Sequence, residues 1–133
     1  MWKTYKVIYL LACLLILSFL TGCNGSVQNE GAANAIETYL EALVTRDFNR
    51  MVNSSCAAWE AQAKVEFDSF AAVRLELNDL ACKETGKENS TKLISCDGSI
   101  IANYGAEDLE INIADRTYLT VQEGGEWRMC GYK

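Results

Sequence analysis

The chain has 133 residues, half of them hydrophobic and 23% charged, and its formal net charge is −6. An acidic chain repels nucleic-acid phosphates and anionic lipid headgroups, so composition argues against a nucleic-acid partner and against membrane binding through a basic surface. The sequence contains no histidine. This excludes histidine metal ligands, histidine general bases and serine–histidine triads.

The amino-terminal segment has the layout of a signal peptide. Lys3 and Lys6 precede an uncharged run over residues 7–20. At roughly 14 residues this run is shorter than the roughly 20 needed to span a bilayer as a helix, and no basic cluster follows it. We therefore expect it to be removed rather than retained.

The residues that follow this run, Leu20-Thr21-Gly22-Cys23, resemble the lipobox of bacterial lipoproteins at all four positions. The resemblance implies a signal peptide over residues 1–22 and a diacylglyceryl group on the sulfur of Cys23. Two or three acyl chains hold a protein durably to a bilayer. We expect an exported protein whose partner is the membrane, reached through the lipid on Cys23, and which faces the cell exterior or periplasm. The alternative is an uncleaved anchor helix in which Cys23 is buried.

The mature chain is a single small domain on a tether. Removal of residues 1–22 leaves ten basic and eighteen acidic residues, a net charge of −8. Residues 23–29 form a short polar, lipidated tether, and residues 30–133 are long enough for one domain with a modest core.

Four cysteines remain in that domain, at positions 56, 82, 96 and 130. An even number outside the cytosol predicts two disulfides. A zinc site is the alternative, but it would need four thiolates from widely spaced positions without a single CxxC pair. We expect no metal and no cofactor.

Helical spacing of apolar residues predicts helices in the amino-terminal half of the domain. They cover residues 30–46, a short segment after the N-cap Asp47, and about 57–68, where Trp59, Ala63 and Phe67 face inward.

Alternating apolar residues predict strands over 72–84 and 91–104, joined by a polar turn. Placing Cys82 opposite Cys96, with a bulge at Asn78-Asp79, puts the apolar side chains on one face. The resulting pairs are Leu80 with Gly98, Leu77 with Ile100, Leu75 with Ala102 and Val73 with Tyr104. A third strand, in which Leu109, Ile111 and Ile113 face Tyr104, Ala102 and Ile100, keeps this register. The preferred disulfides are therefore Cys82–Cys96 and Cys56–Cys130.

Gly124-Gly125 lies between two β-prone segments and predicts a final hairpin. If Glu123 pairs with Glu126, Tyr118, Thr120, Trp127 and Met129 share one face, while Leu119, Val121, Arg128, Cys130 and Tyr132 share the other. Because both faces are partly apolar, we expect Tyr118, Trp127 and Met129 to form a candidate interface on the outer sheet face, for a homodimer or an envelope protein.

Two segments, "AIETYLEALVTRDFNRMVN" and "YLTVQEGGEWRMCGY", resemble the opening helices and closing hairpin of nuclear-transport-factor-2-like domains, also called cystatin-like. The likeness spans residues 30–133. It implies an α+β fold in which N-terminal helices pack on a curved antiparallel four-stranded meander. In such a cone the open end can hold a small molecule, and a sheet face often dimerises.

The candidate pocket residues are Tyr39, Tyr104 and Asp115. Asp79 and Asp115 are interpreted more simply as a turn residue and as half of a solvated ion pair with Arg116, so no catalytic residue is assigned. We expect a non-enzymatic module that binds a small apolar ligand or another envelope protein. The alternative is a small enzyme of the ketosteroid-isomerase-like or dehydratase-like type that uses the cone as its active site.

Overall fold

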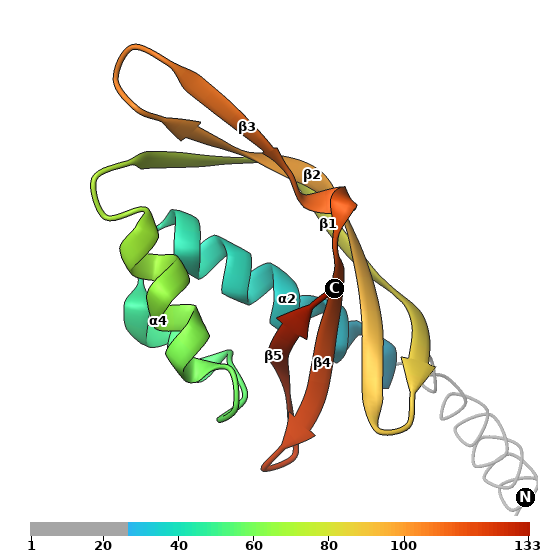
Figure 1. Cartoon of the computed structure of the whole chain (residues 1–133). Helices are drawn as coiled ribbons and strands as arrows, with labels where there is room; N and C mark the ends of the chain where they lie inside the picture. Colours follow the sequence, from blue (N-terminus) through green and yellow to red (C-terminus); the bar gives the residue numbers. More distant parts are fainter. Residues whose placement is uncertain (1–26) are drawn as a thin grey trace, which may run out of the picture.

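The computed structural model describes residues 27–133 (Figure 1). Within this range three helices, α2 (Val27–Val44), α3 (Phe48–Asn53) and α4 (Glu60–Ser69), precede the strands. The strands are β1 (Arg74–Glu88), β2 (Thr91–Asn103), β3 (Asp108–Asn112), β4 (Thr117–Glu123) and β5 (Glu126–Tyr132), with a 3₁₀ turn η2 (Ile113–Asp115) before β4. The fold is α+β, as predicted. The predicted signal peptide and Cys23 lie outside the described residues.

The helices begin and end near their predicted boundaries. Helix α2 starts at Val27, so residues 27–29 of the predicted tether are helical. Asp47 caps α3, because its side chain accepts a hydrogen bond from the backbone N–H of Arg50 at 3.0 Å. Ala63 is the buried residue of α4. In the part of the chain that the structure describes, none of the helices has the length and apolar character needed to cross a bilayer.

The sheet has five strands, so the predicted four-stranded meander is wrong (Figure 1). Strand β2 pairs with β1 along one edge. Its other edge holds two strands, β3 against residues 99–103 and β4 against residues 92–95. Thirteen residues make β2 long enough for both. The 3₁₀ turn separates the two partners, since the Asn112 side chain accepts from the Ala114 N–H at 3.0 Å and ends β3.

The predicted register of β1 and β2 is confirmed on both sides of the predicted bulge. Cys82 lies opposite Cys96 and Leu77 opposite Ile100, with the register broken between Asn78 and Ala81. The bulge divides the sheet into two parts. We call β3 and the segments 74–78 and 99–103 the three-stranded half, and β4, β5 and the segments 81–88 and 91–97 the four-stranded half.

Gly98 is the residue that the bulge requires on β2. Its φ is +111°, and a Cβ atom there would lie 2.5 Å from the Asn78 carbonyl oxygen. Asp79 also has a positive φ, +51°. Bulges bend strands and increase their twist, and the sheet of Figure 1 changes direction between its two halves.

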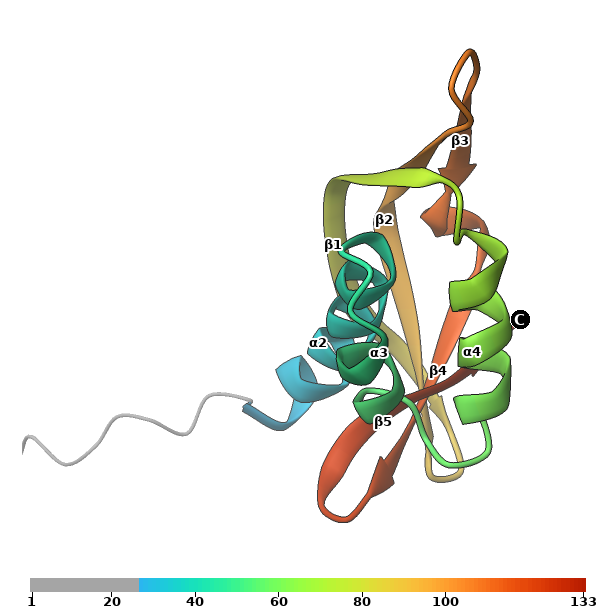
Figure 2. The same ribbon diagram turned by 90° about the vertical axis from the view of Figure 1, so that its left-hand side faces the viewer.

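The helices pack on the concave side of the bent sheet, as Figures 1 and 2 show. This corrects the predicted interface. Tyr118 and Met129 are only 2% and 0% exposed, and Trp127 is half-buried against Gly31 of α2. The face that they share is therefore the inner face, part of the core. The sequence could not settle this point because both faces of the hairpin are partly apolar.

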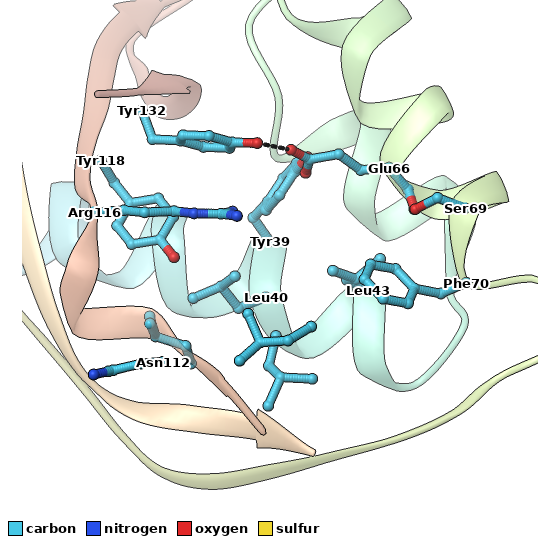
Figure 3. Close-up of a pocket in the computed structure, with 13 residues that line it drawn as sticks. Tyr39, Leu40, Leu43, Glu66, Ser69, Phe70, Asn112, Arg116, Tyr118 and Tyr132 are labelled. Atoms are coloured by element: carbon cyan, nitrogen blue, oxygen red, sulfur yellow. Dashed lines mark hydrogen bonds between the residues drawn. The ribbon is translucent and has the colours of Figure 1, made fainter. Parts of the chain in front are cut away.

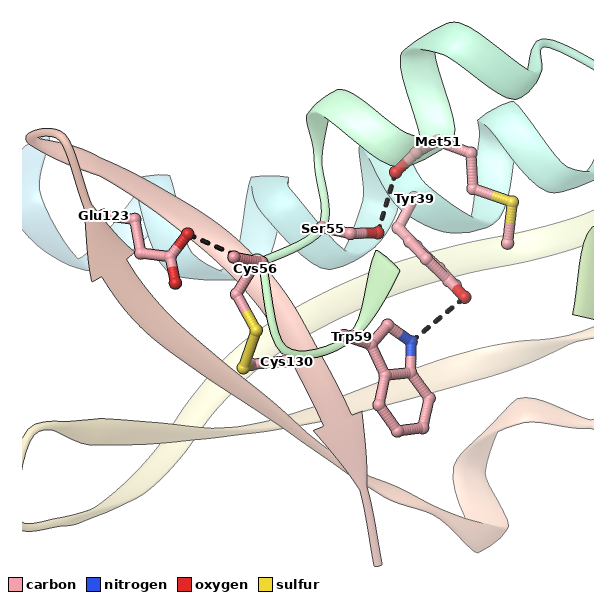
Figure 4. Close-up of a disulfide and its surroundings, with 8 residues drawn as sticks. Tyr39, Met51, Ser55, Cys56, Trp59, Glu123 and Cys130 are labelled. Carbon is pink, nitrogen blue, oxygen red and sulfur yellow. Dashed lines mark hydrogen bonds between the residues drawn. A yellow bond between two sulfur atoms is a disulfide. The ribbon is translucent and has the colours of Figure 1, made fainter. Parts of the chain in front are cut away.

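Both predicted disulfides are present, Cys82–Cys96 and Cys56–Cys130. The second joins the α3–α4 connection to β5 (Figure 4). Beside it the Cys56 N–H donates to the Met129 carbonyl at 2.8 Å, and the Met129 N–H donates to the Ser54 carbonyl at 2.7 Å. This connection covers the outer edge of β5. Two disulfides indicate an oxidising compartment outside the cytosol.

Candidate functional site

A cavity of about 210 Å³ lies between the helices and the sheet. Figure 3 shows Tyr118, Arg116 and Tyr132 on the sheet side, Glu66, Ser69 and Phe70 on the α4 side, and Leu40 and Leu43 of α2 between them. Ile100, Ile111 and Ile113 complete the apolar wall. The pocket lies beside the start of η2 and the end of β3, and Figure 1 shows the rest of β3 running away from the helices.

Glu66 organises the polar end of the pocket. Its two carboxylate oxygens each accept a phenolic hydrogen bond, from Tyr39 at 2.6 Å and from Tyr132 at 2.7 Å. The Tyr39 oxygen in turn accepts from the indole N–H of Trp59 at 3.2 Å (Figure 4). Each member of this cluster of Trp59, Tyr39, Glu66 and Tyr132 therefore has a hydrogen-bond partner inside the protein.

The two phenols of this cluster are held in their neutral form. Burial raises the pKa of Tyr39 well above its ordinary value, and the hydrogen bond and charge of Glu66 raise it further. The same causes, burial before the Glu66 hydrogen bond, raise the pKa of Tyr132. A phenolate beside a carboxylate would be both poorly solvated and repelled. Both tyrosines consequently act as donors to Glu66 at physiological pH.

Arg116 and Tyr118 form the other polar part of the wall. The Arg116 guanidinium carbon lies 4.3 Å from the centre of the Tyr132 ring, a cation–π contact on an exposed side chain. Burial raises the pKa of Tyr118 to about 12, although the positive charge of Arg116 lowers it in part. The Tyr118 hydroxyl is thus a neutral donor near a cation.

Tyr39 is the one predicted pocket residue that lines the cavity. Tyr104 does not, because the end of the β2–β3 hairpin projects beyond the helices and leaves this side chain 55% exposed. Asp115 does not either. It is exposed in η2 and accepts a hydrogen bond from the Asn112 side chain at 3.3 Å. The prediction that Tyr104 and Asp115 are pocket residues is therefore wrong.

Sequence reasoning missed Glu66, Tyr132 and Arg116. Tyr132 reaches the inner face because the register of β4 and β5 shifts between Tyr118 and Thr120, which places Tyr132 opposite Tyr118. Gly131, with φ +122°, carries that irregularity and was the signal available in the sequence. Glu66 follows the buried Ala63 by three positions, which places it beside the inward face of its helix.

Among the described residues there is no group of three or more cysteine, aspartate or glutamate side chains that could hold a metal ion. No protein-family model matches the sequence, and no curated protein matches it significantly.

Proposed function

We propose that this protein is a membrane-anchored bacterial lipoprotein whose nuclear-transport-factor-2-like domain binds a small, mainly apolar ligand without chemical conversion. The observation that carries the proposal is the pocket itself. It combines an apolar wall from α2, the sheet and Phe70 with a few oriented polar groups, the usual composition of a small-molecule site.

The hydrogen bonding of Glu66 favours binding over catalysis. An enzyme that abstracts a proton needs a base with a free oxygen directed at the substrate. Glu66, the acidic residue of the pocket wall, already accepts from both Tyr39 and Tyr132. Proton abstraction would have to compete with these two bonds, so Glu66 is better suited to fixing the shape of the pocket.

The location follows from two independent features. The Leu20-Thr21-Gly22-Cys23 segment resembles a lipobox, and the disulfides require oxidising surroundings. Mass spectrometry of the purified protein should find acyl chains on Cys23 as the first residue. Cys23→Ser should move the protein from the membrane fraction to the soluble fraction. An unacylated, membrane-bound protein that retains residues 1–22 would contradict the anchoring proposal.

Binding can be tested with the neutral fluorophore N-phenylnaphthylamine. The protein for this test is the mature chain, residues 23–133, with Cys23→Ser so that no attached lipid competes. We expect saturable binding of one probe per chain. Ile111→Trp should abolish it, because the larger ring occupies the cavity from its wall.

Val121→Trp is the matched control, since Val121 is half-buried on the opposite sheet face and should leave binding unchanged. Circular dichroism verifies that each variant is folded. Binding that does not saturate, or that survives Ile111→Trp, would refute the pocket as the ligand site.

A further inference from the structure

We propose that the ligand is a fatty carboxylate whose head lies on Arg116 and whose tail leaves the pocket along the inner face of the β2–β3 hairpin. This inference rests on the proposed function and adds the charge and the length of the ligand. Two features carry it, a guanidinium at the pocket wall and an exposed apolar strip that continues that wall.

Arg116 is suited to hold an anionic head. It is exposed, and Tyr132 fixes its guanidinium at the pocket wall through the cation–π contact. The sequence predicted an ion pair with Asp115, but that carboxylate accepts from Asn112 instead, and none of the acidic residues that the structure describes forms an ion pair with Arg116. Its planar N–H groups match a carboxylate.

Glu66 restricts where that head can lie. Its negative charge is at the end of the pocket where Tyr39 and the Tyr132 hydroxyl meet. An anion placed there would be repelled, and it would have to displace two phenolic hydrogen bonds. The head therefore belongs beside Arg116, and the apolar wall beyond Ile113 is left for the tail.

The apolar wall continues outside the cavity. In the sheet register Ile111 is opposite Ile100 and Leu109 is opposite Ala102, and every second residue of a strand shares a face. Ile100 and Ile111 line the pocket, whereas Leu109 is 52% exposed and Tyr104, two residues beyond Ala102, is 55% exposed. These two side chains extend the wall as a strip that no helix covers.

The dimensions indicate a chain longer than the cavity. Since one water molecule occupies about 30 Å³ of liquid, the cavity has room for roughly seven non-hydrogen atoms. The path along β3 from Ile111, which still lines the cavity, to Leu109 adds about 7 Å at about 3.3 Å per residue. A chain of about eight carbons fills the cavity, and about twelve reach the strip.

The strip is a poor fit for a second copy of this chain. Antiparallel pairing of two β3 strands about Glu110 would place this residue opposite itself and Asp108 opposite Asn112, in a segment that also carries Glu107. Like charges directly opposite each other destabilise strand pairing. A flexible alkyl tail covers Leu109 and Tyr104 without approaching these carboxylates.

The head is tested by calorimetric titration of the Cys23→Ser mature chain with octanoate, octanol and octylamine. We expect octanoate to bind about tenfold more tightly than octanol, and octylamine most weakly, because a charge-assisted hydrogen bond is roughly twice as strong as a neutral one. Arg116→Gln should lower octanoate affinity to that of octanol. Arg74→Gln removes the same charge from the other face of the sheet and should have no effect.

These outcomes separate the inference from the proposed function. If octanol binds as tightly as octanoate, or if Arg116→Gln leaves octanoate affinity unchanged, the carboxylate head is refuted while the apolar pocket stands. If none of the three compounds binds and N-phenylnaphthylamine does not bind either, the proposed function itself fails.

The tail is tested with dodecanoate. Each methylene group buried on both sides should strengthen binding about fourfold, and each one on a one-sided strip about twofold. Dodecanoate has four more methylene groups than octanoate, so on the one-sided strip it should bind about 16-fold more tightly. Leu109→Ser should remove most of this gain and leave octanoate affinity unchanged.

The control for the tail is Val65→Ser, because Val65 is 59% exposed on α4 and does not line the pocket. It should preserve the gain from the longer chain. Equal affinities for octanoate and dodecanoate, or an equal loss in Leu109→Ser and Val65→Ser, would overturn the strip as part of the site.

Discussion

The two halves of the sheet have the same alternating pattern but differ in what covers their inner faces. In the four-stranded half Ile94, Tyr118 and Met129 are at most 2% exposed. In the three-stranded half Leu109 is more than half exposed, and so is Tyr104 directly beyond its end, although the same alternation directs both to the inner face. Alternation therefore determines the side of the sheet on which a residue lies, and the helices determine whether it is buried.

The disulfides add to this contrast, because both involve the four-stranded half. Cys82–Cys96 joins two of its strand segments, and Cys56–Cys130 joins β5 to the α3–α4 connection. We expect the largest stability losses from changes in this half. The mature chain with Cys23→Ser serves as the reference protein in the following predictions.

Removal of the Cys56–Cys130 bridge should have the largest effect. On the chain-entropy model a closed loop with a sequence separation of 74 contributes about 4.5 kcal/mol, against about 3 kcal/mol for the separation of 14 at Cys82–Cys96. Urea unfolding of the two double cysteine-to-serine variants measures both. A larger loss for the shorter loop would contradict this order.

Truncation of two residues on the inner face compares the halves directly. Ile94→Ala should lower the free energy of unfolding by about 3 kcal/mol, because this residue is fully buried and leaves a cavity. Leu109→Ala should cost less than about 1 kcal/mol at its exposed position. Urea unfolding tests both, and similar losses would show that the end of the hairpin is covered in solution.

The bulge between the halves depends on Gly98. Gly98→Ala should cost about 2 kcal/mol or more, because the added Cβ would combine an unfavourable φ with a contact of 2.5 Å to the Asn78 oxygen. Gly105→Ala is the control, since Gly105 also has a positive φ but no atom within 4 Å of an added Cβ. Thermal unfolding of the two variants separates backbone strain from the steric clash, and an equal cost would exclude the clash.

Alkaline pH should destabilise the protein through the pocket tyrosines. Burial raises the pKa of Tyr118 to about 12, so the unfolded chain loses this proton first. The stability from this residue is complete below its unfolded pKa of about 10 and is lost as the pH rises to about 12. In Tyr118→Phe the free energy of unfolding should fall less between about pH 9 and about pH 11, by on the order of 1 kcal/mol. An identical fall in Tyr118→Phe and in the reference protein would contradict the raised pKa of Tyr118.

The features that could be predicted from the sequence are those that depend on short-range rules. The cap at Asp47, the Asn78 bulge and the two disulfides follow from capping, side-chain alternation and cysteine pairing, and the structure confirms them. The pairing of β3 with β2 was predicted, although Leu109 pairs with Ala102 rather than with Tyr104. The pairing of β4 with the same edge of β2 was missed, because it depends on the turn that Asn112 starts. Glu66 was missed for a related reason, since its partners Tyr39 and Tyr132 are 27 and 66 residues away in sequence.

The connection between α3 and α4 covers the edge of β5 and blocks strand addition by neighbouring molecules. Ser54 and Cys56 occupy the backbone groups of Met129 that a neighbouring strand would need, and the sulfur bridge to Cys130 keeps them there. An uncovered edge strand is a template on which other chains add. Copies of this protein at high density should therefore stay separate while the Cys56–Cys130 disulfide is intact. A reductant should expose the edge of β5 and allow fibrils to grow from it.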